Sequence, residues 1–259
     1  MNGEQGPQTS EACYNDLALQ QSHLIFNTWS NTMKRILIKL ATALSLTMIV
    51  ATAHAKTDSQ NGPSQYLTPF SEGTHYTTLK EQFPEETTVR EVFSVYCPHC
   101  FKLEPIIQTI KPGLNDYVKV KRHHVDFLRS AKKEEQVDVT KAILLAERHG
   151  VSEDLIGFTF TAIHQHRQLP ERAGLENLLV TLGVPETEVK SIWENKDVAS
   201  EQEKLASMQD AWAKSGDIKG VPTLIVNGKY RVELSGIKAN TGEEFMSQLT
   251  ELINYLTLL

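Results

Sequence analysis

Cysteine is scarce in this 259-residue sequence, which has three, at Cys13, Cys97 and Cys100. Cys13 precedes a predicted export signal, so the exported protein is expected to keep only the Cys97/Cys100 pair. A pair three residues apart closes too short a loop to remove much chain entropy from the unfolded state. The sequence therefore excludes a disulfide-stapled scaffold, and chemical reactivity becomes the better reason for the pair.

Concentrated positive charge is also absent. The formal net charge is −6, and no basic arm or patch supports nucleic-acid binding. With 40% hydrophobic and 22% charged residues, the composition is that of an ordinary globular protein and argues against a largely disordered one.

Residues 33–55 predict export. They begin with a positive Met-Lys-Arg, continue with an apolar stretch and end in Ala53-His54-Ala55, a small–x–small pattern typical of signal-peptidase sites. A membrane anchor is the alternative, but the uncharged run from 40 to 53 has 14 residues and spanning needs about 20. We predict cleavage after Ala55. Residues 1–32 are polar and precede the signal, so we interpret them as a gene-model extension with Met33 as the true start.

The first part of the exported chain, residues 56–127, has the pattern of a strand–helix–strand unit. The buried strand is expected at 89–96, the helix at about 101–110 and the second core strand at 117–127, with a short edge strand at 76–79. This order predicts parallel pairing of the two core strands.

The next part, residues 128–215, lacks a strand candidate and is predicted to be an all-helical insertion. Gly150 is expected to end the first helix and Ser152 to cap the second. The helices are expected at 137–149, 153–166, 174–182, 186–195 and 198–215.

The last part, residues 216–259, returns to strands. A strand at 221–226 is followed by Asn227-Gly228, a strong hairpin signal, and by a strand at 229–234. An amphipathic helix ends the chain, with Thr241 and Glu244 predicted to form its capping box. The predicted fold class is α/β with an inserted all-helical domain.

The motif that carries chemistry is Cys97-Pro98-His99-Cys100, between the first core strand and its helix. Residues three apart share a face of a helix, so the two sulfurs can reach bonding distance. Pro98 suits the first turn, where its missing N–H has no intrahelical partner. The free N–H groups and the dipole favour a thiolate at Cys97, and Cys100 should be shielded behind it.

His99 is expected to stabilise the Cys97 thiolate as an imidazolium, which makes the disulfide a stronger oxidant. A solvent-facing histidine without a role is the alternative. A zinc site is a further alternative for the pair, but no second CxxC exists. Of the neighbouring His123 and His124 only one could join the cysteines, because adjacent strand residues point to opposite faces.

A second motif, Gly220-Val221-Pro222-Thr223, precedes the third core strand. Cis peptide bonds are nearly confined to bonds before proline, and a cis turn facing the CxxC would leave the Val221 backbone free to pair with an extended substrate.

These motifs resemble those of the DsbA-type oxidoreductases of the thioredoxin superfamily. The resemblance rests on EVFSVYCPHC (91–100), KRHHVDF (121–127) and GVPTLIVNGKY (220–230), with HYTTL (75–79) in support, and it spans about 75 to 256. It implies a thioredoxin-like fold interrupted by the helical insertion.

The resemblance also implies roles for single residues. It implies catalytic roles for Cys97, His99 and Cys100 and a cis Val221–Pro222 bond that touches the active site. It suggests that Glu91 is the acid buried beneath the disulfide, with Arg122 as its basic partner. Without the resemblance, a glutamate such as Glu91 would more often be solvated. Glu104, near the CxxC helix, could equally be a surface charge or a minor electrostatic influence on the cysteines.

The function implied is that of a periplasmic oxidase that introduces disulfides into exported polypeptides and is reoxidised by a DsbB-type quinone-linked membrane partner. We expect a monomer that needs no cofactor or metal. A periplasmic isomerase or reductase is one alternative, although the segment before Tyr76 is too short for the usual dimerisation domain. A metal-binding module and a non-catalytic peptide-binding protein are the others.

Overall fold

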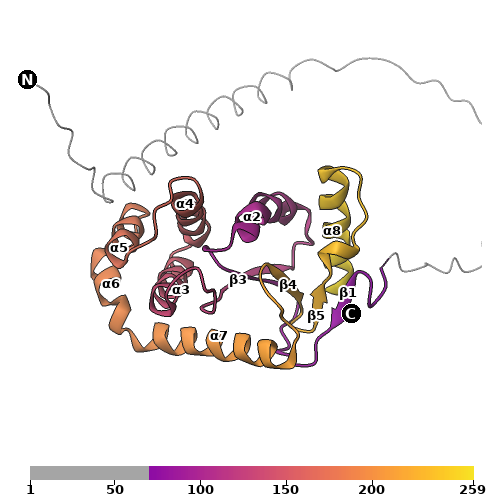
Figure 1. Cartoon of the computed structure of the whole chain (residues 1–259), viewed down its shortest axis with the longest axis horizontal. Helices are drawn as coiled ribbons and strands as arrows, with labels where there is room; N and C mark the ends of the chain where they lie inside the picture. Colours follow the sequence, from indigo (N-terminus) through magenta and orange to yellow (C-terminus); the bar gives the residue numbers. More distant parts are fainter. Residues whose placement is uncertain (1–69) are drawn as a thin grey trace, which may run out of the picture. The chain divides into compact units, whose positions relative to one another are not determined.

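The computed structural model describes residues 70–259, which form a five-stranded mixed sheet with helices around it (Figure 1). The predicted signal peptide, its cleavage site and the leader lie outside the described residues. The domain boundaries at 127/128 and 215/216 stay predictions.

The sheet has the strand order β1-β5-β4-β2-β3. The strands are β1 (Tyr76–Thr78), β2 (Thr88–Phe93), β3 (Lys119–His124), β4 (Thr223–Val226) and β5 (Tyr230–Val232). β2 and β3 pair in parallel, as the strand–helix–strand pattern predicts, and the other neighbours are antiparallel. All six side-chain positions of β2 are buried, because β2 has a strand on each side and helices over it.

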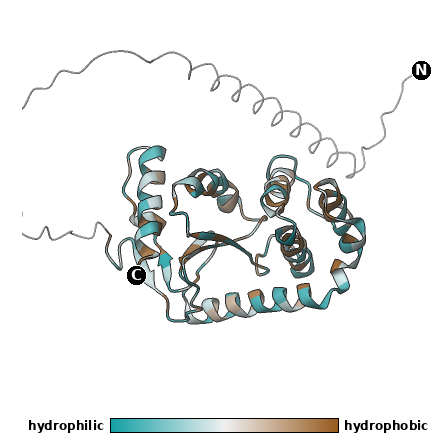
Figure 2. Cartoon of the chain, turned by 180° about the vertical axis from the view of Figure 1, so that it is seen from behind, coloured by the Kyte–Doolittle hydropathy of each residue, from teal (hydrophilic) through white to brown (hydrophobic). Residues whose placement is uncertain are grey.

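Two helices share one apolar core with the sheet. α2 (Pro98–Ile110) contributes Leu103 and Ile107, and α8 (Gly242–Leu256) contributes Leu249 and Ile253. Figure 2 shows the apolar side of α8 as brown turns on an otherwise hydrophilic helix. Burying the apolar stripe of α8 stabilises the fold by roughly 1.5–3 kcal/mol for each large side chain.

The helical insertion separates β3 from β4. It consists of α3 (Lys133–Arg148), α4 (Ser152–His164), α5 (Arg172–Thr181), α6 (Glu186–Ser191) and α7 (Lys196–Ser215), which runs back to the sheet (Figure 1). Short 3₁₀ turns occupy Lys111–Gly113, Ile192–Glu194 and Leu234–Gly236. The fold is thus thioredoxin-like with an all-helical insertion.

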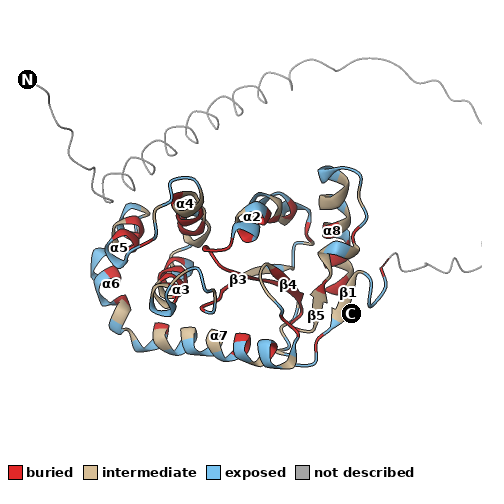
Figure 3. Cartoon of the chain, viewed as in Figure 1, coloured by how far each residue is buried: buried red, intermediate tan, exposed pale blue. Residues whose placement is uncertain are grey.

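The core of the insertion is continuous with the end of the sheet that carries the cysteine motif. Its buried residues include Phe160 of α4 and Leu178 of α5, and the same cluster contains Phe93, Cys97 and Cys100. Figure 3 shows buried turns in red on α3, α4 and α5. The two tryptophans of the insertion differ: Trp212 is fully buried, whereas Trp193 is only partly buried and donates to Glu176. The insertion therefore packs directly behind the cysteine motif.

Several predicted boundaries are wrong by a few residues. β2 ends at Phe93 because residues 94–96 turn so that the Cys97 N–H can donate to Ser94. Likewise, β3 covers 119–124 rather than 117–127, and β4 begins at Thr223, since proline has no N–H for a ladder.

Two predicted helix caps also need correction. Ser152 is the first residue of α4 and not its cap, a position that Val151 takes without a side-chain hydrogen bond. Thr241 does cap α8 by accepting from the Glu244 N–H, but the Glu244 carboxylate accepts from Asn240 rather than from Thr241, so the reciprocal half of the predicted box is missing.

Candidate active site

Cys97 stands at the junction of β2 and α2. The buried strand delivers the chain into a turn, where the Cys97 N–H donates to the Ser94 carbonyl over 3.0 Å. Cys97 is the N-cap of α2, and Pro98 is the first helical residue. Local sequence explains the arrangement, because an apolar strand followed by proline at the first helical position favours a helix that begins there.

The two cysteine side chains lie on one face of the first turn of α2. The Cys100 N–H donates to Cys97 Sγ over 3.3 Å, so the sulfur fills the capping position that an oxygen usually takes. Cys97 is 6% exposed, whereas Cys100 is completely buried. Both are free thiols, which makes this the dithiol form of the pair.

The surroundings of the two sulfurs shift the pKa values of Cys97 and Cys100 in opposite directions. The pKa of Cys97 is lowered to about 6, chiefly by the hydrogen bond from the Cys100 thiol and further by the N–H groups of Cys100 and His99 and the charge of the His99 ring. The contact with Cys97 and burial raise the pKa of Cys100. The arrangement can hold a thiolate at Cys97 and a proton at Cys100.

The second motif reaches the same place from the far end of the chain. The Val221–Pro222 bond is cis, and the Val221 carbonyl lies 3.4 Å from Cys97 Sγ. The next residue, Thr223, begins β4 and bonds back to the Gly220 carbonyl. The tertiary fold thus brings together two motifs that are more than a hundred residues apart in the sequence.

A buried charge cluster involves three of the predicted residues. Glu91 is 1% exposed, and its carboxylate lies 2.8 Å from Arg122, which also meets Glu104 over 2.5 Å. Burial raises the pKa of Glu91 to about 7, and the Arg122 charge offsets part of that rise. The residue-level expectation of a solvated Glu91 is therefore wrong, and Glu104 is an ion-pair partner rather than a free surface charge.

The two adjacent histidines point to opposite faces of β3, as strand geometry requires. His124 lies behind the turn of residues 94–97, which we call the catalytic turn, 3.3 Å from Ser94 Oγ and 2.9 Å from Thr140 Oγ1. His123 packs beside the Trp212 indole. Among residues 70–259, no three metal-ligating side chains gather in one place.

Sequence reasoning missed one histidine near the motif. His164 lies at the end of α4, with its Nε2 atom 2.8 Å from the Val95 carbonyl oxygen, and its ring stacks on Phe101. No signal in the sequence marks it, because the contact depends on how the insertion packs on the sheet.

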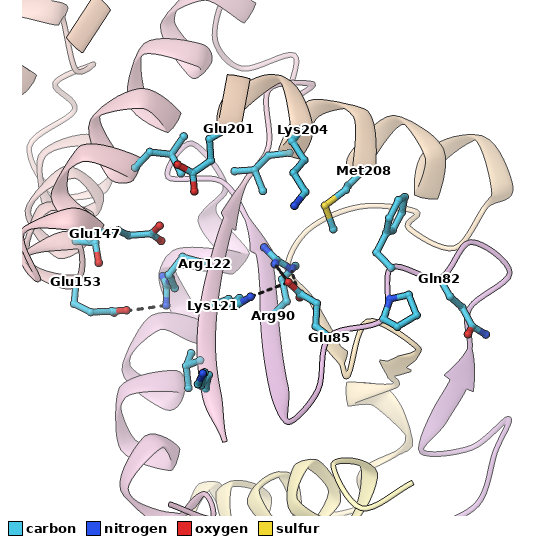
Figure 4. A pocket seen from close by; sticks show the side chains of 17 residues that line it. Gln82, Glu85, Arg90, Lys121, Arg122, Glu147, Glu153, Glu201, Lys204 and Met208 are labelled. Atoms are coloured by element: carbon cyan, nitrogen blue, oxygen red, sulfur yellow. Dashed lines mark hydrogen bonds and ion pairs between the residues drawn. The ribbon is translucent and has the colours of Figure 1, made fainter. Parts of the chain in front are cut away.

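A groove of about 760 Å³ lies away from the cysteines, between β3, α3 and α7 (Figure 4). Its labelled side chains are mostly charged and partly paired, with Glu85 between Arg90 and Lys121. Arg122 lines it as well and lies 3.8 Å from Glu153, so the buried charge cluster borders this groove. The groove holds no thiol and is not the site of disulfide chemistry.

Comparison with known proteins is consistent with this geometry. A family model described as a DSBA-like thioredoxin domain matches residues 88–253. The chain is 29% identical over 189 residues to the thiol:disulfide interchange protein DsbA of Salmonella typhimurium, covering 72% of this chain and 87% of that protein. Identity to DsbA of Escherichia coli K12 is 26% over 191 residues, with 73% and 88% covered.

Solved structures give the same result. The disulfide oxidoreductase DsbA from Proteus mirabilis superposes with a TM-score of 0.62 at 25% identity, covering 73% of this chain and 98% of that one. A cysteine-to-serine form of the same protein, in complex with the non-covalently bound peptide PWATCDS, superposes with a TM-score of 0.63. None of the helices in the described part of this chain has the length and apolar run needed to span a bilayer.

Proposed function

This chain belongs to the family of DSBA-like thioredoxin domains, and from that premise we propose that it oxidises cysteine pairs in exported polypeptides through a Cys97–Cys100 disulfide. It is a thiol:disulfide oxidoreductase. One observation carries the proposal: an N-capping sulfur with a pKa lowered to about 6 lies in front of a fully buried second thiol. A stabilised thiolate favours the reduced pair and so makes the disulfide a strong oxidant.

The reaction begins with the oxidised protein. A substrate thiolate attacks Cys97 Sγ, the Cys97–Cys100 bond breaks, and Cys100 leaves with the electron pair and takes up a proton. The second substrate thiolate then attacks the substrate sulfur of the mixed disulfide, and Cys97 leaves as a thiolate. The substrate loses two electrons and two protons, and the protein is reduced.

Substrate backbone is proposed to pair at Val221 and Pro222. The Val221 carbonyl already contacts Cys97 Sγ, so an extended chain hydrogen-bonded there would present its cysteine to the reactive sulfur. The Proteus mirabilis relative binds a cysteine-containing peptide, which supports this class of substrate.

Proton movement at Cys100 is assigned to Glu91. A carboxyl with a pKa raised to about 7 can exchange a proton near neutral pH, and its charge also raises the pKa of Cys100. Arg122 pairs with that carboxyl and is itself paired with Glu104, and the charge of His99 helps to lower the pKa of Cys97 at the helix start.

The place of action is proposed to be the periplasm, reached through the signal at 33–55 with cleavage after Ala55. A DsbB-type membrane oxidase linked to quinone would restore the disulfide. The exchange itself uses only sulfur chemistry.

The test is the redox equilibrium of the protein purified from the periplasm of an expression host, measured against glutathione by thiol trapping. We expect a potential near about −120 mV, the value that marks DsbA among protein disulfides, and no exchange in Cys97→Ala. A potential near thioredoxin's, about −270 mV, would refute the oxidase and indicate a reductase.

A further inference from the structure

His164 lies at the C-terminal end of α4, in the helical insertion, and reaches the catalytic turn. Its Nε2 is 2.8 Å from the carbonyl oxygen of Val95, two residues before Cys97. A carbonyl oxygen only accepts hydrogen bonds, so Nε2 carries the hydrogen and the imidazole donates. The donor and the acceptor are 69 residues apart in the sequence.

The same ring also touches the other flank of the cysteine motif. It stacks on Phe101, the residue directly after Cys100, with ring centroids 4.9 Å apart and an interplanar angle of 14°. Phe160, one turn earlier on α4, packs against both rings. A single side chain of the insertion therefore contacts the backbone before Cys97 and the side chain after Cys100.

The flanks it contacts control the geometry of the sulfurs. The turn is closed by the bond from the Cys97 N–H to Ser94, and the Cys97 sulfur is held by the Cys100 N–H. On the other side of Val95, the Ser94 hydroxyl meets His124, which in turn meets Thr140 of α3. A shift of the turn changes the N–H···S contact that lowers the pKa of Cys97.

We propose that His164 is a positioning residue: its Nε2–H to Val95 hydrogen bond holds the catalytic turn against the helical insertion and thereby shifts the redox equilibrium of the Cys97–Cys100 pair toward the dithiol. The inference rests on the proposed function, since it concerns the same pair. By this inference, a residue of the helical insertion helps to determine the redox potential of the Cys97–Cys100 pair.

Two substitutions separate the hydrogen bond from the ring contact. His164→Phe keeps an aromatic ring to stack on Phe101 but removes the donor, and His164→Gln keeps an amide N–H donor but removes the ring. His166→Phe is the matched control, because His166 is an exposed histidine two residues further on whose side chain forms no hydrogen bond or ion pair among residues 70–259.

The readouts are the equilibrium constant with glutathione and the Cys97 pKa from thiolate absorbance. In His164→Phe the constant is expected to move about fivefold toward the protein disulfide, as the loss of a hydrogen bond worth about 1 kcal/mol predicts. The Cys97 pKa is expected to rise in that variant. His164→Gln should stay within about twofold of the wild type, and His166→Phe should not differ from it.

The unfolding free energies of the oxidised and reduced forms test whether His164 has only a general structural role. Loss of a side chain that only stabilises the fold lowers both unfolding free energies equally and leaves the glutathione constant unchanged, whereas loss of a positioning residue lowers the unfolding free energy of the reduced form more. An unchanged constant in His164→Phe, or an equal shift in His166→Phe, overturns the inference. A wild-type protein that exchanges no disulfide with glutathione refutes the proposed function instead.

Discussion

The lowered pKa of Cys97 predicts that the reduced protein gains stability relative to the oxidised protein as the pH rises. The hydrogen bond from the Cys100 thiol and the N–H groups at the helix start lower the pKa of Cys97 from its ordinary value of 9.0 to about 6. Between these values the unfolded chain binds more protons than the native one, so stability rises with pH. This contribution is complete above about pH 9 and is lost as the pH falls through about 6.

The size follows from the shift. At about 1.36 kcal/mol per pKa unit, the interval from pH 6 to pH 8.5 corresponds to about 3.4 kcal/mol at most. Because Cys97 is already half ionised at pH 6 in the fold and the unfolded thiol begins to ionise by pH 8.5, the change over this interval is about 2–3 kcal/mol. The oxidised protein has no thiol to titrate at this site, so subtracting its unfolding free energy removes the contributions of Glu91 and other groups common to both forms.

The assay is urea unfolding of the reduced and oxidised proteins at several pH values, followed by tryptophan fluorescence. The free energy of unfolding of the reduced form, minus that of the oxidised form, should rise by about 2–3 kcal/mol from pH 6 to pH 8.5. Reduced Cys97→Ala should lose this dependence. A difference that stays constant with pH, or a thiolate midpoint near 8.5 in wild type, would show that the helix start does not stabilise the thiolate.

Three further predictions concern buried side chains. Because burial raises the pKa of Glu91, the wild-type protein should lose up to about 3 kcal/mol of unfolding free energy as the pH rises from 4.5 to 7, and Glu91→Gln should not. Parallel plots of unfolding free energy against pH for the two oxidised proteins would contradict this. Burial lowers the His123 pKa to about 3, so the wild-type protein should lose up to about 1.4 kcal/mol of unfolding free energy per pH unit as the pH falls below 6.5. His123→Phe should lose less, which urea unfolding between pH 4 and 6.5 would test. Trp212→Ala should lower the free energy of unfolding by about 3–5 kcal/mol through loss of a fully buried indole, and a loss below 1 kcal/mol would place that indole outside the core.

Local chemistry made much of the fold predictable. The Asn227-Gly228 pair takes positive φ at both residues, 52° and 64°, in the turn that joins β4 to β5, although Val226 pairs with Tyr230, so the loop is one residue longer than the predicted two-residue hairpin. The apolar stripe of α8 and the cap at Thr241 likewise depend on residues within one or two turns of each other. Such contacts can be predicted from the sequence because the spacing of the residues alone brings the groups together.

The sequence by itself therefore determined the redox pair. Cysteines three apart at the start of a helix share a face and meet the helix N–H groups whatever surrounds them. The α/β fold class with an all-helical insertion also followed, since the alternation of strand and helix patterns is a property of the chain, and the resemblance of its motifs implied that this fold is thioredoxin-like.

Only the tertiary structure decided what surrounds the pair. The contact of the Val221 carbonyl with Cys97 spans 124 positions, and the donation from His164 to Val95 spans 69. The burial of Glu91 against Arg122 depends on the register of two parallel strands and the helices over them. Composition and periodicity do not encode these distances, because they arise from packing between segments that are far apart along the chain.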